Sequence, residues 1–156
     1  MRLFAIVAVL GAVGVGGPIS ANGAQVWAPA GWHRIASAGD GPVTDPRTLL
    51  VVGTSGVRPH ITQCQIAAYS IPHAGAVVVI VGWKGANGDT RLGTKELARL
   101  VAVKRSVFEC LKGRGAVATV VLRQREYQVN VMVDDRATKR RIGEALDVAH
   151  SFALKR

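Results

Sequence analysis

The chain has few aromatic residues, few cysteines and half as many acidic as basic side chains. Aromatic residues make up 5% of its 156 residues, and none forms a regular pattern along a basic segment. Single-stranded nucleic acids are bound by aromatic side chains interleaved with basic ones, so we expect no nucleic-acid partner. Beyond the N-terminus the longest apolar run covers residues 76–81. A membrane-spanning helix needs about 20 such residues, so none is predicted there.

The N-terminus has the three parts of a secretory signal peptide. A positive start is followed by an uncharged apolar run over residues 3–15, and then by small residues at Ala21 and Gly23. Signal peptidase requires small side chains at these two positions before its cut. The sequence therefore predicts a signal peptide over residues 1–23 and a single exported domain over residues 24–156.

The alternative for this segment is an uncleaved membrane anchor. Residues 3–19 form its longest version, with 17 residues that include four glycines and one proline. This is short for a spanning helix, so we favour cleavage. The first cysteine is Cys64, which excludes a lipid-modified cysteine at the end of the leader.

The basic charge is concentrated in the second half of the chain. The whole sequence has 20 basic and 10 acidic residues. The net charge is +1 over residues 24–83, from three arginines and two aspartates, and +8 over residues 84–156, from 16 basic and 8 acidic residues. The densest cluster is Lys139, Arg140 and Arg141. A basic surface attracts polyanions, so we predict that these three residues contact an anionic surface.

The two cysteines, Cys64 and Cys110, are both in the predicted exported domain. An even number of cysteines in an oxidising compartment favours a disulfide. The alternatives are two buried free thiols or a metal site in which His60 joins Cys64 at an H-x-x-x-C spacing. That spacing lacks two further ligands at motif positions. We therefore predict the disulfide and no metal.

Several segments have the patterns of strands and helices. β-branched runs and alternation predict strands, and an i, i+3, i+4 apolar rhythm predicts a helix. Thr138 is the expected N-cap of the last helix. The expected elements are strands over residues 48–53, 62–69 and 76–83, a short helix passing into a strand over 94–105, a hairpin of 116–123 and 126–133 joined by Gln124-Arg125, and a helix over 139–152.

These elements predict an α+β fold. We expect an antiparallel sheet packed with helices, in which a C-terminal β-hairpin is followed by an amphipathic helix. Pro29-Ala30-Gly31-Trp32 near the start, a hairpin with tyrosine in its second strand, and Ser151-Phe152 at the end resemble exported bacterial proteins of unknown function. More remotely they resemble the PsbP-like fold. The resemblance implies a non-catalytic binding or assembly role and assigns no site residues.

Tryptophan and histidine are the first candidates for ligand contacts or catalysis. Tryptophan is highly buried on average, so packing is the favoured role for all three. No histidine lies at close spacing to both an acid and a nucleophile. The residues concerned are Trp27, Trp32, Trp83, His33, His60, His73 and His150.

Serine and aspartate give the other catalytic candidates. Ser55 lies in a Gly-Thr-Ser-Gly tract that lacks the second spacer of a nucleophile elbow. Asp134 and Asp135 are adjacent, so on an extended chain they point to opposite sides; they are interpreted as turn and cap residues. No glycine-rich tract matches a phosphate-binding loop. The sequence therefore predicts no catalytic residue and no cofactor.

The favoured function is a non-catalytic binding or assembly module of the bacterial cell envelope. Its expected location is extracytoplasmic, either secreted, periplasmic or associated with the cell wall. Its expected partners are anionic envelope components or another protein. The alternative is a small extracytoplasmic hydrolase whose site is assembled only in three dimensions.

Overall fold

A computed structural model describes the larger part of the chain, namely residues 15–38, 45–60, 64, 66–85, 93–105 and 107–156. Of these residues, 45% are in strands and 15% in helices. The elements in chain order are β1 (Gly17–Ala21), β2 (Ala24–Ala28), β3 (Trp32–Arg34), β4 (Arg47–Thr54), β5 (Arg58–Pro59), β6 (Tyr69–Ser70), β7 (Ala76–Gly82), the 3-10 helix η1 (Thr94–Arg99), β8 (Lys104–Arg105), β9 (Gly113–Leu122), β10 (Arg125–Asp134), the α-helix α1 (Lys139–His150) and β11 (Ala153–Leu154).

Strand β7 lies inside a six-stranded antiparallel sheet with the order β3-β4-β7-β10-β9-β8. Its sequence AVVVIVG is rich in β-branched residues, which favour strands, and all seven residues are buried. A continuous apolar run of this kind fits a strand covered on both faces. The predicted strand over residues 76–83 and its double burial are confirmed.

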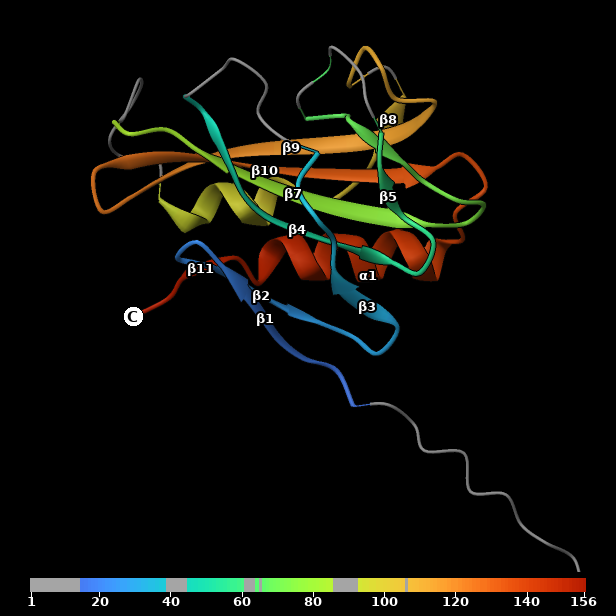
Figure 1. Cartoon of the computed structure of the whole chain (residues 1–156), viewed down its shortest axis with the longest axis horizontal. Helices are drawn as coiled ribbons and strands as arrows, with labels where there is room; N and C mark the ends of the chain where they lie inside the picture. The colour runs from blue at the N-terminus through green and yellow to red at the C-terminus, as the bar shows by residue number, and fades with distance from the viewer. Residues whose placement is uncertain (1–14, 39–44, 61–63, 65, 86–92, 106) are drawn as a thin grey trace, which may run out of the picture.

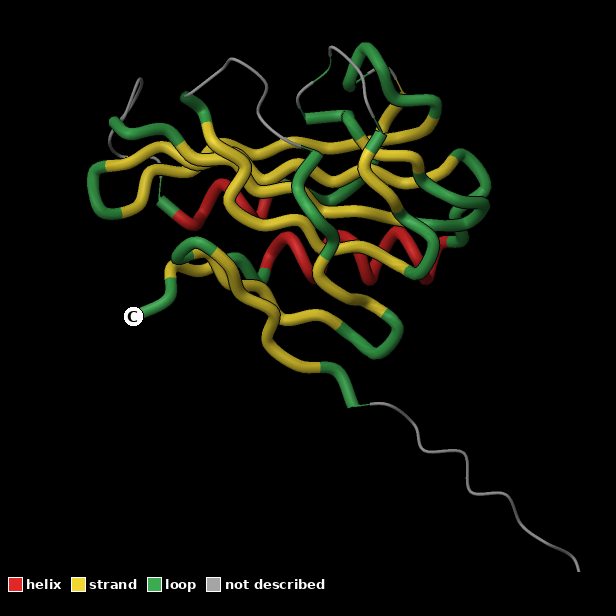
Figure 2. The backbone as a smooth tube through the Cα atoms, viewed as in Figure 1, coloured by secondary structure: helices red, strands yellow, loops and turns green. Residues whose placement is uncertain are grey.

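Helix α1 and a second sheet cover the first face of the central sheet (Figures 1 and 2). The second sheet has the order β1-β2-β11. Val78 and Ile80 of β7 share one core with Ala145 and Ala149 of α1 and with Val26 of β2. The helical spacing places the apolar stripe of α1 against the sheet, and η1 lies on the same side (Figure 1).

Loops cover the second face, above the sheet in Figure 1. Val77 and Val79 of β7 belong to a core with Tyr69. A disulfide joins Cys64 to Cys110, with 6.3 Å between their Cα atoms, so the predicted disulfide is confirmed. The bond links two segments that pack on this core through Ile66, Phe108 and Leu111.

The predicted fold class is wrong. The structure is mostly β, with three antiparallel sheets in its described part, and α1 is the one α-helix among the described residues. The cover of the second face comes from a stretch that contains Gly56, Pro59, Pro72 and Gly75. Glycine and proline interrupt helices, so this stretch forms turns and the short hairpin β5–β6.

No helix in the described part is long and apolar enough to span a membrane.

The C-terminal hairpin and the helix after it are present. The two-residue turn of the hairpin is Arg123-Gln124, both with positive φ, one residue earlier than predicted. Leu122 pairs with Arg125 across this turn. Thr138 caps α1 as predicted, since its hydroxyl accepts the backbone N–H of Arg141.

The other predicted elements are found in part. The strand predicted over residues 48–53 is confirmed as β4, and the helix that passes into a strand is found as η1 followed by β8. Residues 62, 63 and 65 of the predicted strand over 62–69 lie outside the described residues, and among the others only the last, Tyr69, is in a strand.

The disulfide leads to a stability prediction. Replacing Cys64 and Cys110 together by Ser is expected to lower the free energy of unfolding by up to about 4 kcal/mol. The reason is that the disulfide reduces the conformational entropy of the unfolded chain. Denaturant unfolding followed by tryptophan fluorescence measures the loss. The unsubstituted protein under reducing conditions is the control and should show the same loss. Equal unfolding midpoints for the oxidised protein, the reduced protein and the double variant would contradict a stabilising role of the disulfide.

Candidate functional site

A cavity of about 720 Å³ opens at one end of the central sheet. We name it the basic end cavity. Its walls come from the ends of the strands and from the last residues of the chain. Among the described residues it is lined by Asn22, Gly23, Asp45, Arg47, Thr48, Leu49, Gly82, Trp83, Lys84, Arg123, Arg125, Tyr127, Leu154 and Lys155.

Antiparallel pairing explains why these distant segments meet. Strand β7 ends at Gly82, where its neighbours β4 and β10 begin. Gly82 pairs with Arg47 on one side and with Tyr127 on the other. The hairpin turn after β9 lies at the same end, since Arg125 pairs with Leu122. The basic residues at these strand ends are therefore brought to one edge of the sheet.

The absence of a side chain at Gly82 shapes the floor of the basic end cavity. A Cβ atom there would lie 2.8 Å from Cδ1 of Leu49 and 3.1 Å from the Tyr127 ring. Both distances are shorter than ordinary contacts, so Gly82 is what lets these two side chains approach the end of β7. A register shift in β4 lies between Thr48 and Leu50, and irregularities of this kind re-aim side chains. Leu49 thereby packs, with Leu50, on the core between the central sheet and α1, which we call the first core.

The second sheet supplies the opposite wall. Strands β1 and β2 are joined by Asn22-Gly23, where φ is 47° and 80°; Asn-Gly is the preferred pair for such a hairpin turn. The side-chain amide of Asn22 donates to the carbonyl of Leu49 over 2.9 Å. The backbone N–H of Lys155 donates to the carbonyl of Gly23, also over 2.9 Å. These two bonds hold the turn against β4 and the end of the chain against the turn.

The charge of the basic end cavity is strongly unbalanced. Among the residues that the structure describes, its lining has one carboxylate, on Asp45, and that carboxylate accepts the backbone N–H of Lys84. Within the described residues, no carboxylate lies at ion-pair distance from any of four lining cations, namely Lys84, Arg123, Arg125 and Lys155. The lining cations are Arg47, Lys84, Arg123, Arg125 and Lys155.

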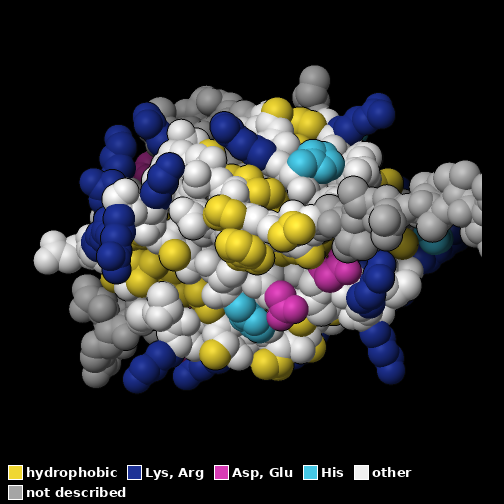
Figure 3. All heavy atoms as spheres, turned by 90° about the horizontal axis from the view of Figure 1, so that it is seen from below, with side chains coloured by type: hydrophobic (Ala, Val, Ile, Leu, Met, Phe, Trp, Pro, Cys, Tyr) yellow, Lys and Arg dark blue, Asp and Glu magenta, His cyan; other side chains and the backbone are white. Residues whose placement is uncertain are grey.

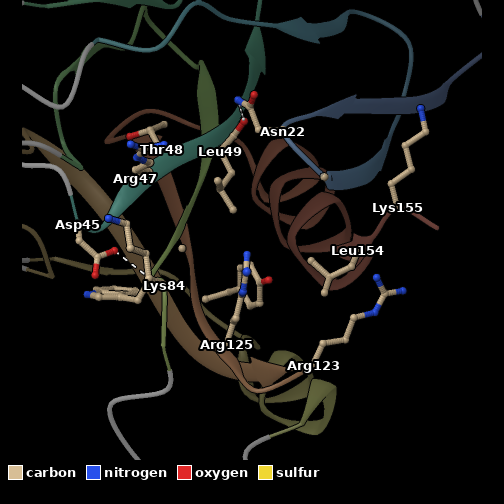
Figure 4. A pocket seen from close by; sticks show the side chains of 14 residues that line it. Asn22, Asp45, Arg47, Thr48, Leu49, Lys84, Arg123, Arg125, Leu154 and Lys155 are labelled. Carbon is tan, nitrogen blue, oxygen red and sulfur yellow. Dashed lines mark hydrogen bonds between the residues drawn. The ribbon is translucent and has the colours of Figure 1, made fainter.

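Lysine and arginine side chains gather at the corresponding end of the surface, next to exposed hydrophobic side chains (Figure 3). The close view shows Leu49 and Leu154 projecting into the space between the two sheets, with Arg123 and Arg125 below them (Figure 4). Both leucines are partly buried against the first core. The basic end cavity thus combines cationic and apolar walls.

This lining is suited to binding an anion. Arginine binds carboxylates and phosphates with two parallel hydrogen bonds, and a cleft lined by one sign of charge concentrates ions of the other sign. The described lining contains no histidine, cysteine or serine. The described part of the chain also holds no cluster of three or more His, Cys, Asp or Glu side chains placed for a metal ion.

The residues predicted to contact an anionic surface lie elsewhere. Lys139, Arg140 and Arg141 form the first turn of α1. Glu144, one turn later, makes ion pairs with both Arg140 and Arg141, so part of their charge is compensated. Trp32 also donates its indole N–H to Glu144 over 3.4 Å. None of these residues lines the basic end cavity.

The serine and histidine candidates are not joined into a catalytic group. Ser55 is exposed in the turn after β4, and within the described residues its side chain makes no hydrogen bond to a histidine. His150 lies at the end of α1, with its Nε2 2.9 Å from the carbonyl of Leu100. The other histidines are exposed on separate segments: His33, His60 and His73.

The three tryptophans have different environments. Trp32 is buried in the first core, as predicted. Trp83 is partly buried and lines the basic end cavity. Trp27 is 58% exposed on β2, so of the predicted packing roles, in the core or at its rim, the core is excluded for this residue. In the β1–β2 hairpin Trp27 pairs with Pro18 and not with a residue of the central sheet.

Asp134 has a structural role at the end of β10. Its carboxylate accepts the backbone N–H groups of Ala74 and Arg136, each over 3.0 Å. Burial alone raises the pKa of this carboxyl, but the two hydrogen bonds and the nearby His73 and Arg136 outweigh it and hold the pKa below its ordinary value. Asp135 instead makes an exposed ion pair with Arg105.

Sequence reasoning did not identify the basic end cavity. The signal that was available is the basic residue at each strand end: Arg47 before the apolar run of β4, Lys84 after that of β7, and Arg123 and Arg125 around the hairpin turn. In antiparallel neighbours such ends coincide, so knowledge of the strand order would have revealed the cluster.

Comparisons with known proteins assign no family to the chain. The sequence matches no protein-family model and no curated protein. A function is therefore inferred from the charge and shape of the cavity itself.

The hydrogen bonds of Asp134 lead to a pH prediction. Because the folded-state pKa is lowered, the carboxylate stabilises the fold above the pKa of the unfolded chain, and this contribution is lost as the pH falls below about 4. Asp134→Asn is expected to lower the free energy of unfolding at pH 7 by about 1 kcal/mol and to flatten its pH dependence in acid. Denaturant unfolding between about pH 2 and about pH 7 measures both quantities, because these values bracket the pKa of an aspartate in the unfolded chain, about 4.

Asp135→Asn is the matched control for this experiment. It removes the same charge from the neighbouring position, where the ion pair with Arg105 is exposed. Exposed ion pairs contribute about 0–1 kcal/mol, so a smaller change is expected. An Asp134→Asn protein that keeps the acid slope of the original chain would rule out this role of Asp134.

Proposed function

We propose that this chain is a non-catalytic binding module of the bacterial cell envelope and that it holds an anionic ligand in the basic end cavity. The observation that supports the proposal is that, among the described residues, five cationic side chains and one carboxylate line a single hollow. This cluster gathers residues from β4, the segment after β7, the β9–β10 turn, β10 and the C-terminal end.

Electrostatics favour an anion as the occupant. Like charges that share one hollow repel each other, and an anionic ligand offsets this repulsion. Arg123 and Arg125 lie on the two sides of Gln124 in the tight turn, so their guanidinium groups extend from a fixed backbone. Charge-assisted hydrogen bonds are about twice as strong as neutral ones, and a phosphate or carboxylate accepts several of them.

The apolar walls point to an anion with a hydrophobic part. Leu49, Tyr127 and Leu154 line the same hollow as the cations. A cavity of about 720 Å³ is in the range that holds small organic ligands, which bind mostly through apolar contacts with a few polar groups for orientation. A phospholipid head group with the first carbons of its acyl chains has this combination of properties.

The proposed location is extracytoplasmic. The disulfide between Cys64 and Cys110 is compatible with an oxidising compartment. Export by the leader, association with the cell envelope and the resemblance to PsbP-like proteins stay predictions. The hydrolase alternative would need a nucleophile and a base within hydrogen-bond reach, and no observation among the described residues favours it.

Binding of short-chain phospholipid monomers tests the proposal. Dihexanoyl phosphatidylglycerol is expected to bind, and dihexanoyl phosphatidylcholine, which has no net charge, is expected to bind at least tenfold more weakly. Glycerol phosphate separates the contribution of the head group from that of the chains. Calorimetric titration at low and at physiological ionic strength should show weaker binding in more salt. Equal affinity for the anionic and the neutral lipid would overturn the proposal.

Two double variants locate the site. Arg123→Gln with Arg125→Gln is expected to weaken binding of the anionic lipid by at least about tenfold, because each lost charge-assisted hydrogen bond contributes about 1.5–3 kcal/mol. Lys139→Gln with Arg140→Gln removes the same charge from α1, outside the cavity, and should change affinity little. The reverse result would place the anion contact on α1, as the sequence alone predicted.

A further inference from the structure

Strand β1 lies in the segment predicted to be removed with the leader, yet it is part of the folded domain. The predicted cut after Gly23 falls in the turn between β1 and β2. All five residues of β1 pair with β2, from Gly17 opposite Ala28 to Ala21 opposite Ala24. Strand β2 is the middle strand of its sheet, so loss of β1 would leave one of its edges without a partner.

Side chains of β1 also pack on the first core. Ile19 and Ala21 are partly buried against it. The chain is closely packed from Gly16 onward, because a Cβ atom at Gly16 would lie 2.5 Å from the carbonyl oxygen of Ala28. Val15, in contrast, is 94% exposed. Within the described residues, close packing therefore begins at Gly16.

The same segment completes the basic end cavity. Asn22 and Gly23 line it, Asn22 is bonded to the carbonyl of Leu49, and Gly23 accepts the N–H of Lys155. A chain beginning at Ala24 would lack both bonds. It would also lose the turn that fixes the C-terminal end against the cavity.

We propose that β1 and the Asn22-Gly23 turn belong to the mature protein and that signal peptidase cuts between Gly14 and Val15. Ala12 and Gly14 then supply the two small side chains before the cut that the enzyme requires. The apolar run before them covers residues 3–11, nine residues, which lies within the about 7–15 typical of this region, and the leader as a whole has 14 residues, just under the usual about 15–30. The peptidase acts on the chain before it folds, so the proposal depends on what the folded domain needs and not on access to the folded protein.

The mass of the exported protein tests this proposal. The full-length chain is expressed in a bacterial host with its own leader, and the protein recovered outside the cytoplasm is analysed by intact-mass and N-terminal peptide measurements. A chain starting at Val15 is expected. A chain starting at Ala24 would overturn the proposal, whatever ligand the domain binds.

Two substitutions in the full-length chain distinguish the two cuts. Gly14→Leu places a large side chain directly before the proposed cut and is expected to abolish processing. Ala21→Leu is the matched control, because it blocks only a cut after Gly23, and processing should continue at Val15. Processing that survives Gly14→Leu and stops with Ala21→Leu would overturn the proposal. Both readouts are independent of lipid binding, so the proposed function can fail without affecting them.

Discussion

Double-sided burial of β7 is the constraint on which the rest of the fold depends. Its seven residues are all buried, so both faces of the central sheet have to be covered. Val78 and Ile80 face the core shared with α1 and β2, whereas Val77, Val79 and Val81 face the core beneath the loops. The two covers differ in kind. Regular elements pack on the first face, and irregular segments tied by the Cys64–Cys110 bond cover the second.

The basic end cavity is the gap left at one edge of the central sheet, where the second sheet does not fully cover the first face. Strands β4, β7 and β10 reach the same edge, where Gly82 has no side chain to fill the space between Leu49 and Tyr127. The β1–β2 turn and β11 come close from the other side without closing the gap. Basic residues are stable there because they stand at strand ends, where long side chains keep their charges in water. The same position makes them available to an anion.

Local patterns were sufficient for several elements. The apolar run of β7, the alternation of Tyr127 and Val129 in the hairpin, and the helical stripe predicted up to Phe152 each follow from the period of a strand or a helix. The structure contains all three elements, with the helix ending at His150. The fold class was wrong because it depends on what covers the second face. That cover is formed by turns rich in glycine and proline, whose arrangement has no sequence period.

The sequence by itself determined strands β4, β7, β9 and β10, the last helix, the basic character of the chain and the two cysteines available for pairing. Each of these depends on residue type and short-range spacing. Only the tertiary structure decided which charges act together. Lys139, Arg140 and Arg141 form the densest basic cluster in the sequence, but Glu144 lies one helical turn away, pairs with two of them and compensates part of their charge. Arg47, Lys84 and Arg125 are far apart in the sequence and become neighbours through the antiparallel order of β4, β7 and β10, which is set by long-range strand pairing.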